Sequence, residues 1–177
     1  MSRAPVARRF LPALLLALSL ALGGAAPASA EDWQFGNLKL RWLDGFRYVP
    51  QGDVERFLGP QGEGVVVSAA GFGAKTEAER EPLLARHRAF AETELPRLAF
   101  VRGGLELPLA RATLSDGSLL YSTGTALALP KDEAGFFLQF LVIGRSGDMA
   151  FFTVEGKGAV AAQMARFRPL FDSVKWE

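Results

Sequence analysis

The sequence predicts an α+β domain in which antiparallel strands, joined by hairpins, pack with two helices. Three observations support this fold class. Apolar residues recur at every second position in several segments, as in strands with one buried face. Two pairs of these segments flank tight-turn sequences that are typical of β-hairpins. Two further segments repeat apolar residues at the spacing of an amphipathic helix.

Residues 1–30 are predicted to be an export signal that is removed from the mature protein. They contain a basic beginning with three arginines, an apolar stretch over residues 11–22, and a small-residue cleavage site from Ala28 to Ala30. The apolar stretch is shorter than the roughly 20 residues that span a bilayer. We therefore expect cleavage after Ala30. The adjacent arginines resemble a twin-arginine signal without its usual spacer, so export of the folded protein is the alternative.

The mature chain, residues 31–177, has 147 residues, which is the size of one domain with a substantial core. Three of the 20 Lys and Arg residues lie in the signal, so 17 remain beside 19 Asp and Glu, and the net charge becomes −2. This balance gives no electrostatic reason to expect nucleic acid as a partner. The lack of cysteine excludes disulfides and thiolate metal sites. No later segment is apolar for long enough to span a membrane, so we expect a soluble periplasmic protein, or a secreted one if the host lacks an outer membrane.

The first half of the mature chain predicts several strands. Apolar and polar residues alternate over residues 38–42, as a half-buried strand requires. The glycine- and proline-rich stretch that follows contains two short candidates, residues 46–49 and 54–58. Residues 65–70 begin with three valines and are apolar almost throughout, which predicts a strand covered on both faces.

The second half predicts four antiparallel strands in two hairpins. They are residues 105–109, 119–127, 136–143 and 149–155. Pro108 places the first of them at a sheet edge or at a bulge, because proline has no N–H for the ladder. Asp116-Gly117 and residues 144–148 supply the two turns. Residues 136–143 are apolar on both faces but for one glutamine, so this strand should be central.

The first helix is expected after residue 75. Thr76 is an N-cap residue and Glu79 completes a capping box, whereas Pro82 leaves a start at Pro82 as the alternative. The apolar side is predicted to contain Leu83, Leu84, Phe90, Ala91, Leu95 and Leu98. The helix should lie across a sheet.

The second helix shows one apolar stripe. Its members are Val160, Met164, Phe167 and Phe171. Arg166 is expected to face away from this stripe, and Pro169 to end or kink the helix.

Residues 65–79 resemble a phosphate-binding loop between a strand and a helix. A Walker-type loop needs glycine directly before Lys75 and again five residues earlier, yet Ala74 and Ala69 stand there. The dinucleotide pattern fails at Thr76, where its third glycine belongs. A helix cap explains these residues better, so no cofactor-binding residues are predicted.

No catalytic or metal-binding residues are predicted either. His87 is the only histidine, and it lies near the centre of the apolar side of the first helix. A histidine in that place is more often a hydrogen-bonded core residue than a general base. Glu94 projects on nearly the same side and could pair with His87 or meet a backbone donor. The remaining carboxylates are scattered, without a calcium-loop motif.

Aromatic residues crowd the beginning of the mature chain. They are Trp33, Phe35, Trp42, Phe46 and Tyr48. One interpretation places Trp42 and Phe46 in the core and Trp33 at the terminus. The other treats all five as a possible interaction surface, because exposed aromatic patches usually mark binding.

The order of these elements resembles the Mog1/PsbP-like proteins, including periplasmic DcrB-type members. The tail MARFRPLFDSVKW, residues 164–176, is similar to that family's ending, in which a helix with spaced aromatic residues leads into a short strand. The resemblance implies an antiparallel β-sheet sandwiched between helices. It also implies action by binding, as in photosystem accessory subunits, a small-GTPase partner and secretion factors. The family has no common catalytic residues to transfer.

We therefore expect a non-enzymatic exported binding or accessory module that contacts another protein, in a secretion, assembly or immunity-type role. A carrier of a small apolar ligand or lipid is the alternative, and it would need an internal apolar cavity. An enzyme is the third possibility, and it would need polar groups that converge near His87 or Glu94.

Overall fold

The computed structural model describes residues 32–177 apart from 51–53, 71–75 and 101–103, so the predicted export signal and Lys75 lie outside the described residues. The strands are β1 (Asp32–Phe35), β2 (Leu38–Arg41), β3 (Arg47–Tyr48), β4 (Glu55–Leu58), β5 (Gly64–Ala70), β6 (Leu107–Thr113), β7 (Leu119–Ala128), β8 (Ala134–Ile143), β9 (Met149–Lys157) and β10 (Lys175–Trp176). The helices are α1 (Glu77–Thr93), α2 (Leu95–Phe100) and α3 (Val160–Phe167), with 3-10 segments η1 (Pro130–Asp132) and η2 (Arg168–Ser173).

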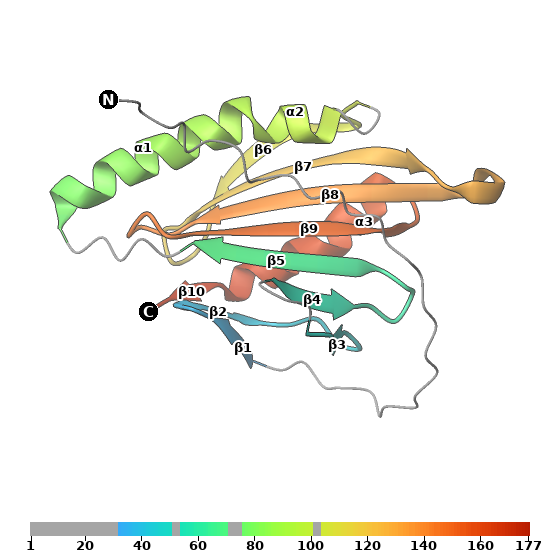
Figure 1. Ribbon diagram of the computed structural model, residues 1–177, viewed down its shortest axis with the longest axis horizontal. Coiled ribbons are helices and arrows are strands. Elements are labelled where there is room, and N and C mark those ends of the chain that lie inside the picture. The colour runs from blue at the N-terminus through green and yellow to red at the C-terminus, as the bar shows by residue number, and fades with distance from the viewer. Residues whose placement is uncertain (1–31, 51–53, 71–75, 101–103) are drawn as a thin grey trace, which may run out of the picture.

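Two antiparallel sheets form the body of the protein. The larger has seven strands in the order β3-β4-β5-β9-β8-β7-β6, and the smaller has the order β1-β2-β10. Helices α1 and α2 lie over one face of the large sheet, whereas α3 and the small sheet pack against the other (Figure 1). The sheet is therefore sandwiched between helices, which confirms the predicted α+β fold class.

Strand β8 is buried over nine consecutive residues, 135–143. It pairs with β7 on one side and with β9 on the other, both antiparallel. This confirms the central position predicted for residues 136–143 and both predicted hairpins. Gly117 and Gly147 have φ angles of +85° and +87° in the two turns, a conformation that only glycine adopts at little steric cost.

The larger part of the core lies between the large sheet, α3 and the small sheet. The ring centroid of Phe171 lies 4.5 Å from that of Phe140 and 5.1 Å from that of Phe152. Phe167 is fully buried on the same side. Helix α3 ends at Phe167 and Pro169 lies in η2, so the predicted end of this helix is confirmed.

Arg166 does not face away from the core as expected. Its guanidinium forms an ion pair with Glu63, whose side chain is completely buried. The guanidinium carbon also lies 5.8 Å from the ring centroid of Phe46 and 5.5 Å from that of Phe167. The expectation is wrong because a buried carboxylate from the β4–β5 turn needs a cation, and Arg166 is within reach only in the folded chain.

A smaller core lies beneath α1 and α2. Its buried members are Leu84, Ala91, Leu95, Leu119, Tyr121, Leu141 and Ile143. Leu98, which we expected on this side, is 39% exposed, whereas Ala99 is fully buried. The buried side continues from Ala91 through Leu95 to Ala99 at four-residue intervals, and this spacing turns Leu98 outward.

Two strands show how position in the sheet modifies the sequence pattern. Val65 and Val67 of β5 are buried, but Ser68 is exposed, so the expectation that both faces are covered is wrong. Strand β6 is one of the two edge strands of the large sheet, and its register with β7 shifts between Leu107 and Ala110. The edge position and the bulge predicted from Pro108 are therefore both present.

The capping box at the start of α1 is formed as predicted. The backbone N–H of Glu79 donates to the Thr76 hydroxyl at 3.3 Å, and the N–H of Thr76 donates to the Glu79 carboxylate at 3.0 Å. Helix α1 continues through Pro82, so a start at Pro82 is wrong. The carbonyl that loses its N–H partner belongs to Ala78, which is exposed, and water can satisfy it there.

We expect Thr76→Ala to lower the free energy of unfolding by about 1 kcal/mol, because the backbone N–H of Glu79 loses the hydroxyl that accepts its hydrogen bond. Thr76→Ser keeps the hydroxyl and should remain close to the wild type. Urea-induced unfolding measures both variants. Equal stability of the Ala and Ser variants would show that the box contributes nothing.

Candidate functional site

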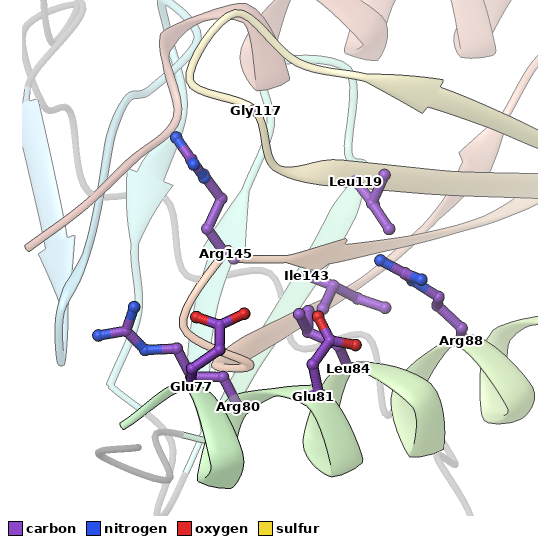
Figure 2. A pocket seen from close by; sticks show the side chains of 10 residues that line it. Glu77, Arg80, Glu81, Leu84, Arg88, Gly117, Leu119, Ile143 and Arg145 are labelled. Carbon is purple, nitrogen blue, oxygen red and sulfur yellow. The ribbon is translucent and has the colours of Figure 1, made fainter. Parts of the chain in front are cut away.

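An open groove lies between α1 and the turns that end the two hairpins, and Figure 2 shows it from close by. Its volume is about 360 Å³. It is lined by Glu77, Arg80, Glu81, Leu84, Arg88, Gly117, Leu119, Ile143, Gly144 and Arg145. We refer to it as the α1 groove.

The α1 groove has an apolar floor, formed by Leu84, Leu119 and Ile143, all of which are buried. Leu119 and Ile143 are directly paired in the ladder of β7 and β8. They stand at the ends of these strands, next to the two turns, and α1 passes over them. The floor is therefore the outer end of the core beneath α1.

Charged side chains form the rim. Those from α1 are Glu77, Arg80, Glu81 and Arg88, and Arg145 comes from the β8–β9 turn (Figure 2). The α1 residues follow intervals of three and four, which place them along one side of the helix. The rim thus carries three guanidinium groups and two carboxylates, all facing the same hollow.

Most of these charges have no ionic partner within the described part of the chain. Glu77, Glu81, Arg88 and Arg145 form no ion pair among the described residues. The Nε atom of Arg88 is buried and lacks a hydrogen-bond partner there. The α1 groove therefore presents available charges above an apolar surface.

His87, next to this groove in the sequence, points into the protein and is 3% exposed. Its imidazole forms a hydrogen bond with the Gly147 backbone. Burial lowers the pKa of His87 below 6.5 and the charge of Arg86 lowers it further, while the Gly147 contact and Asp148 act in the opposite direction. His87 is thus the hydrogen-bonded core residue that its spacing predicts.

The turn that holds His87 is itself fixed by a buried carboxylate. Asp148 is 2% exposed and accepts hydrogen bonds from Asn37 at 2.6 Å and from the Ser146 hydroxyl at 2.7 Å. Glu94, the other residue considered beside His87, is the exposed C-cap of α1 and pairs with Arg97 at 3.1 Å. Helix α1 ends at Thr93, and this ending places Glu94 on the surface rather than beside the imidazole.

The five aromatic residues near the start of the mature chain do not form one surface. Trp42 and Phe46 are each 5% exposed and belong to the core, so their assignment to an interaction surface is wrong. Trp33 and Phe35 are half-buried and pack against the same core. Tyr48 is 47% exposed. Trp33 of the small sheet and Trp42 pack against Phe57 of β4, with ring centroids 5.2 Å and 3.8 Å away, so these rings join the small sheet to the large one.

A second hollow, of about 500 Å³, lies on the small sheet. It is lined by Asp32, Trp33, Gln34, Lys39, Leu40, Arg41, Ser173 and Lys175. Arg41 pairs with Asp32 at 3.5 Å, and Lys39 pairs with Glu177. Because two of its cations are already paired, this hollow offers fewer available charges than the α1 groove.

Sequence reasoning missed the residues of the α1 groove. For the first helix it predicted only the apolar side, and neither Arg88 nor Arg145 was among the predicted site residues. The series of charges at helical intervals beside Leu84 was a signal that could have been used. Arg145 could not have been added, because its turn is far from α1 in sequence and meets it only in the fold.

The described residues include no group of three or more His, Asp or Glu side chains that could hold a metal ion. Thr76 and Glu79 of the possible phosphate loop are engaged with each other in the capping box. Within the described ranges, no helix has both the length and the apolar character needed to cross a membrane.

No protein-family model matches the chain, and no curated protein matches it either. Among solved structures, the chain is similar in fold to the solution structure of cyanobacterial PsbP (CyanoP) from Synechocystis sp. PCC 6803. The match covers 89% of this chain and 98% of that one, with 17% sequence identity and a TM-score of 0.46. The order of elements resembles the same PsbP-like group.

The position of His87 predicts a pH-dependent stability. The unfolded chain titrates this group near pH 6.5 and the folded chain below it, so the unfolded state binds the proton more readily. The stabilisation is complete above pH 6.5 and is lost as the pH falls through and below that value. The free energy of unfolding should therefore fall more between about pH 7.5 and about pH 5.5 for the wild type than for His87→Gln. Parallel pH profiles of the two proteins would contradict this.

Proposed function

We propose that the mature protein is a non-enzymatic exported binding module that contacts another protein, in a secretion, assembly or immunity-type role. We propose the α1 groove as its contact site. The observation that carries this proposal is the combination of an apolar floor with Glu77, Glu81, Arg88 and Arg145 on its rim, none of which has an ionic partner among the described residues.

The lining of the α1 groove favours a polypeptide over a small apolar ligand. Five of its ten lining residues are charged. Sites for small ligands are mostly apolar and contain a few placed polar groups. A protein segment, in contrast, brings both apolar side chains for the floor and charged side chains for the rim. This is why we prefer a protein partner to the carrier alternative.

The exposed aromatic residues supply a second proposed contact. The Tyr48 and Trp33 rings lie 5.5 Å and 5.2 Å from the ring centroid of Phe57, and the rings of Trp33 and Phe35 stack at 5.6 Å. Tyr48 and Trp33 thus both contact the buried Phe57 ring, Phe35 stacks on Trp33, and each of the three keeps part of its surface accessible. Amphipathic aromatic side chains of this kind are enriched in protein interfaces.

Site-specific photo-crosslinking in cells of the organism of origin tests the contact. A photoreactive residue in place of Glu81, on the rim of the α1 groove, should form a covalent adduct with one discrete protein. The same residue in place of Arg86, which is exposed on another side of α1 and does not line the groove, is the matched control and should form none. Adducts of equal yield at both positions, or none at Glu81, would contradict the proposal.

Export can be tested on the intact protein. Mass spectrometry of the exported chain should find Glu31 as its first residue. Ala28→Leu and Ala30→Leu should block processing, because signal peptidases require small residues at these two positions. Ser29→Leu, between them, should still be processed. Recovery of a chain that retains residues 1–30 in the wild type would contradict cleavage after Ala30.

A further inference from the structure

The α1 groove has a cation at each end and an apolar floor between them. Figure 2 shows Arg145, Arg80 and Glu77 together at one end and Arg88 at the other. The side chains of Leu84, Ile143 and Leu119 lie between α1 and the strands in the same view. Both Arg88 and Arg145 are without an ion pair among the described residues.

The Arg88 end reaches furthest into the protein. Arg88 is half-buried, and its Nε–H lies inside without an acceptor among the described residues. The hydroxyl of Tyr121, which is 1% exposed, likewise has no hydrogen-bond partner in that part of the chain. Burial raises the pKa of Tyr121, Arg111 and Arg88 lower it, and Glu92 raises it. A guanidinium that is partly removed from water, and that forms no ion pair among the described residues, is a site that an anionic group would stabilise.

The length of the groove fits a short extended segment. Arg80, which lies at the same end of the groove as Arg145 in Figure 2, is eight residues from Arg88 on α1, which corresponds to about 12 Å along the helix axis. Four residues of an extended strand span about 13 Å. In such a strand the side chains at positions 1, 3 and 5 point to the same side. A segment of five residues can therefore place its first and fifth side chains at the two ends of the groove and its third over the floor.

We propose that the α1 groove binds an extended acidic segment of a partner protein with the pattern acidic-x-apolar-x-acidic. One carboxylate pairs with Arg88, the other pairs with Arg145, and the apolar side chain covers Leu84, Leu119 and Ile143. This inference rests on the proposed function, which assigns the groove to a protein partner.

The glutamates of the rim restrict the intervening positions. Glu77 and Glu81 lie on the helix side of the groove and have no cation paired with them among the described residues. Further acidic residues at the x positions would meet these carboxylates and be repelled. The segment is therefore one with two spaced acidic residues, and a continuous acidic run is disfavoured.

Synthetic peptides test this pattern on the full mature chain. The probe is acetyl-Gly-Glu-Ala-Leu-Ala-Glu-Gly-amide, with binding measured by isothermal titration calorimetry. The same peptide with both Glu replaced by Gln is the matched neutral control, and one with Glu-Glu in succession tests the spacing. The spaced acidic peptide should bind about tenfold or more tightly than either, and its binding should weaken with added salt.

Variants assign the effect to named residues. Arg88→Gln and Arg145→Gln should each weaken binding of the acidic peptide about tenfold or more. Arg86→Gln removes the same charge from an exposed position of α1 outside the groove lining, and should leave binding nearly unchanged. The Arg88→Glu variant should no longer bind the acidic peptide. It should instead bind a peptide in which Lys replaces the Glu that faces residue 88, which is the first Glu for one direction of the segment and the last Glu for the other. This exchange excludes unfolding as the cause.

Equal affinity for the acidic and neutral peptides would overturn the inference, as would equal effects of the Arg86 and Arg88 variants. A specific cross-link at the Glu81 position together with no binding of the acidic peptide would overturn the acidic pattern alone. The absence of any cross-link would instead contradict the proposed function, whatever the peptides do.

Discussion

The burial of β8 on both faces is the constraint on which the rest of this structure depends. Phe136 and Phe140 point to one side and Leu141 and Ile143 to the other, and all four are at most 1% exposed. A strand of this kind is stable only if both faces of its sheet are covered. Helices α1 and α2, which precede the two hairpins in the chain, cover one face of the large sheet. Helix α3 and the small sheet, whose last strand follows the hairpins, cover the other face.

The β8–β9 turn connects the two covers and so shapes the α1 groove. On one side, a Cβ atom at Gly147 would lie 2.9 Å from the Cβ atom of Leu83. The Gly147 backbone also forms a hydrogen bond with the His87 side chain. On the other side, a Cβ at Gly144 would lie 3.0 Å from the Trp176 indole. Asp148 adds the hydrogen bond from Asn37. Such close approaches require glycine, and they hold α1 and Arg145 at a fixed separation across the groove.

The two covers are not equivalent, and this difference bears on function. The side of α3 and the small sheet contains the larger core and the buried pair of Glu63 and Arg166, so its charges are largely satisfied. The side of α1 contains the smaller core, and the helix passes over the ends of β7 and β8, where the buried Leu119 and Ile143 line the floor of the α1 groove. Glu77, Glu81, Arg88 and Arg145, which form no ion pair among the described residues, lie at that boundary. A binding role is therefore more naturally assigned to the α1 side than to the aromatic cluster that the sequence emphasises.

The sequence by itself determined the features that depend on neighbours along the chain. The capping box of Thr76, both hairpins and the edge position of β6 are each set by local hydrogen bonding or by two-residue periodicity, which any reader of the sequence can follow. Only the tertiary structure decided which charges are paired. Arg166 forms an ion pair with Glu63, and Arg145 lines the α1 groove beside residues of α1. These residues are distant in sequence, so the local pattern of apolar and polar residues does not predict that they lie together. The choice between the core and an interaction surface for Trp42 and Phe46 stayed open in the sequence for the same reason, because burial depends on what the fold brings to cover a side chain.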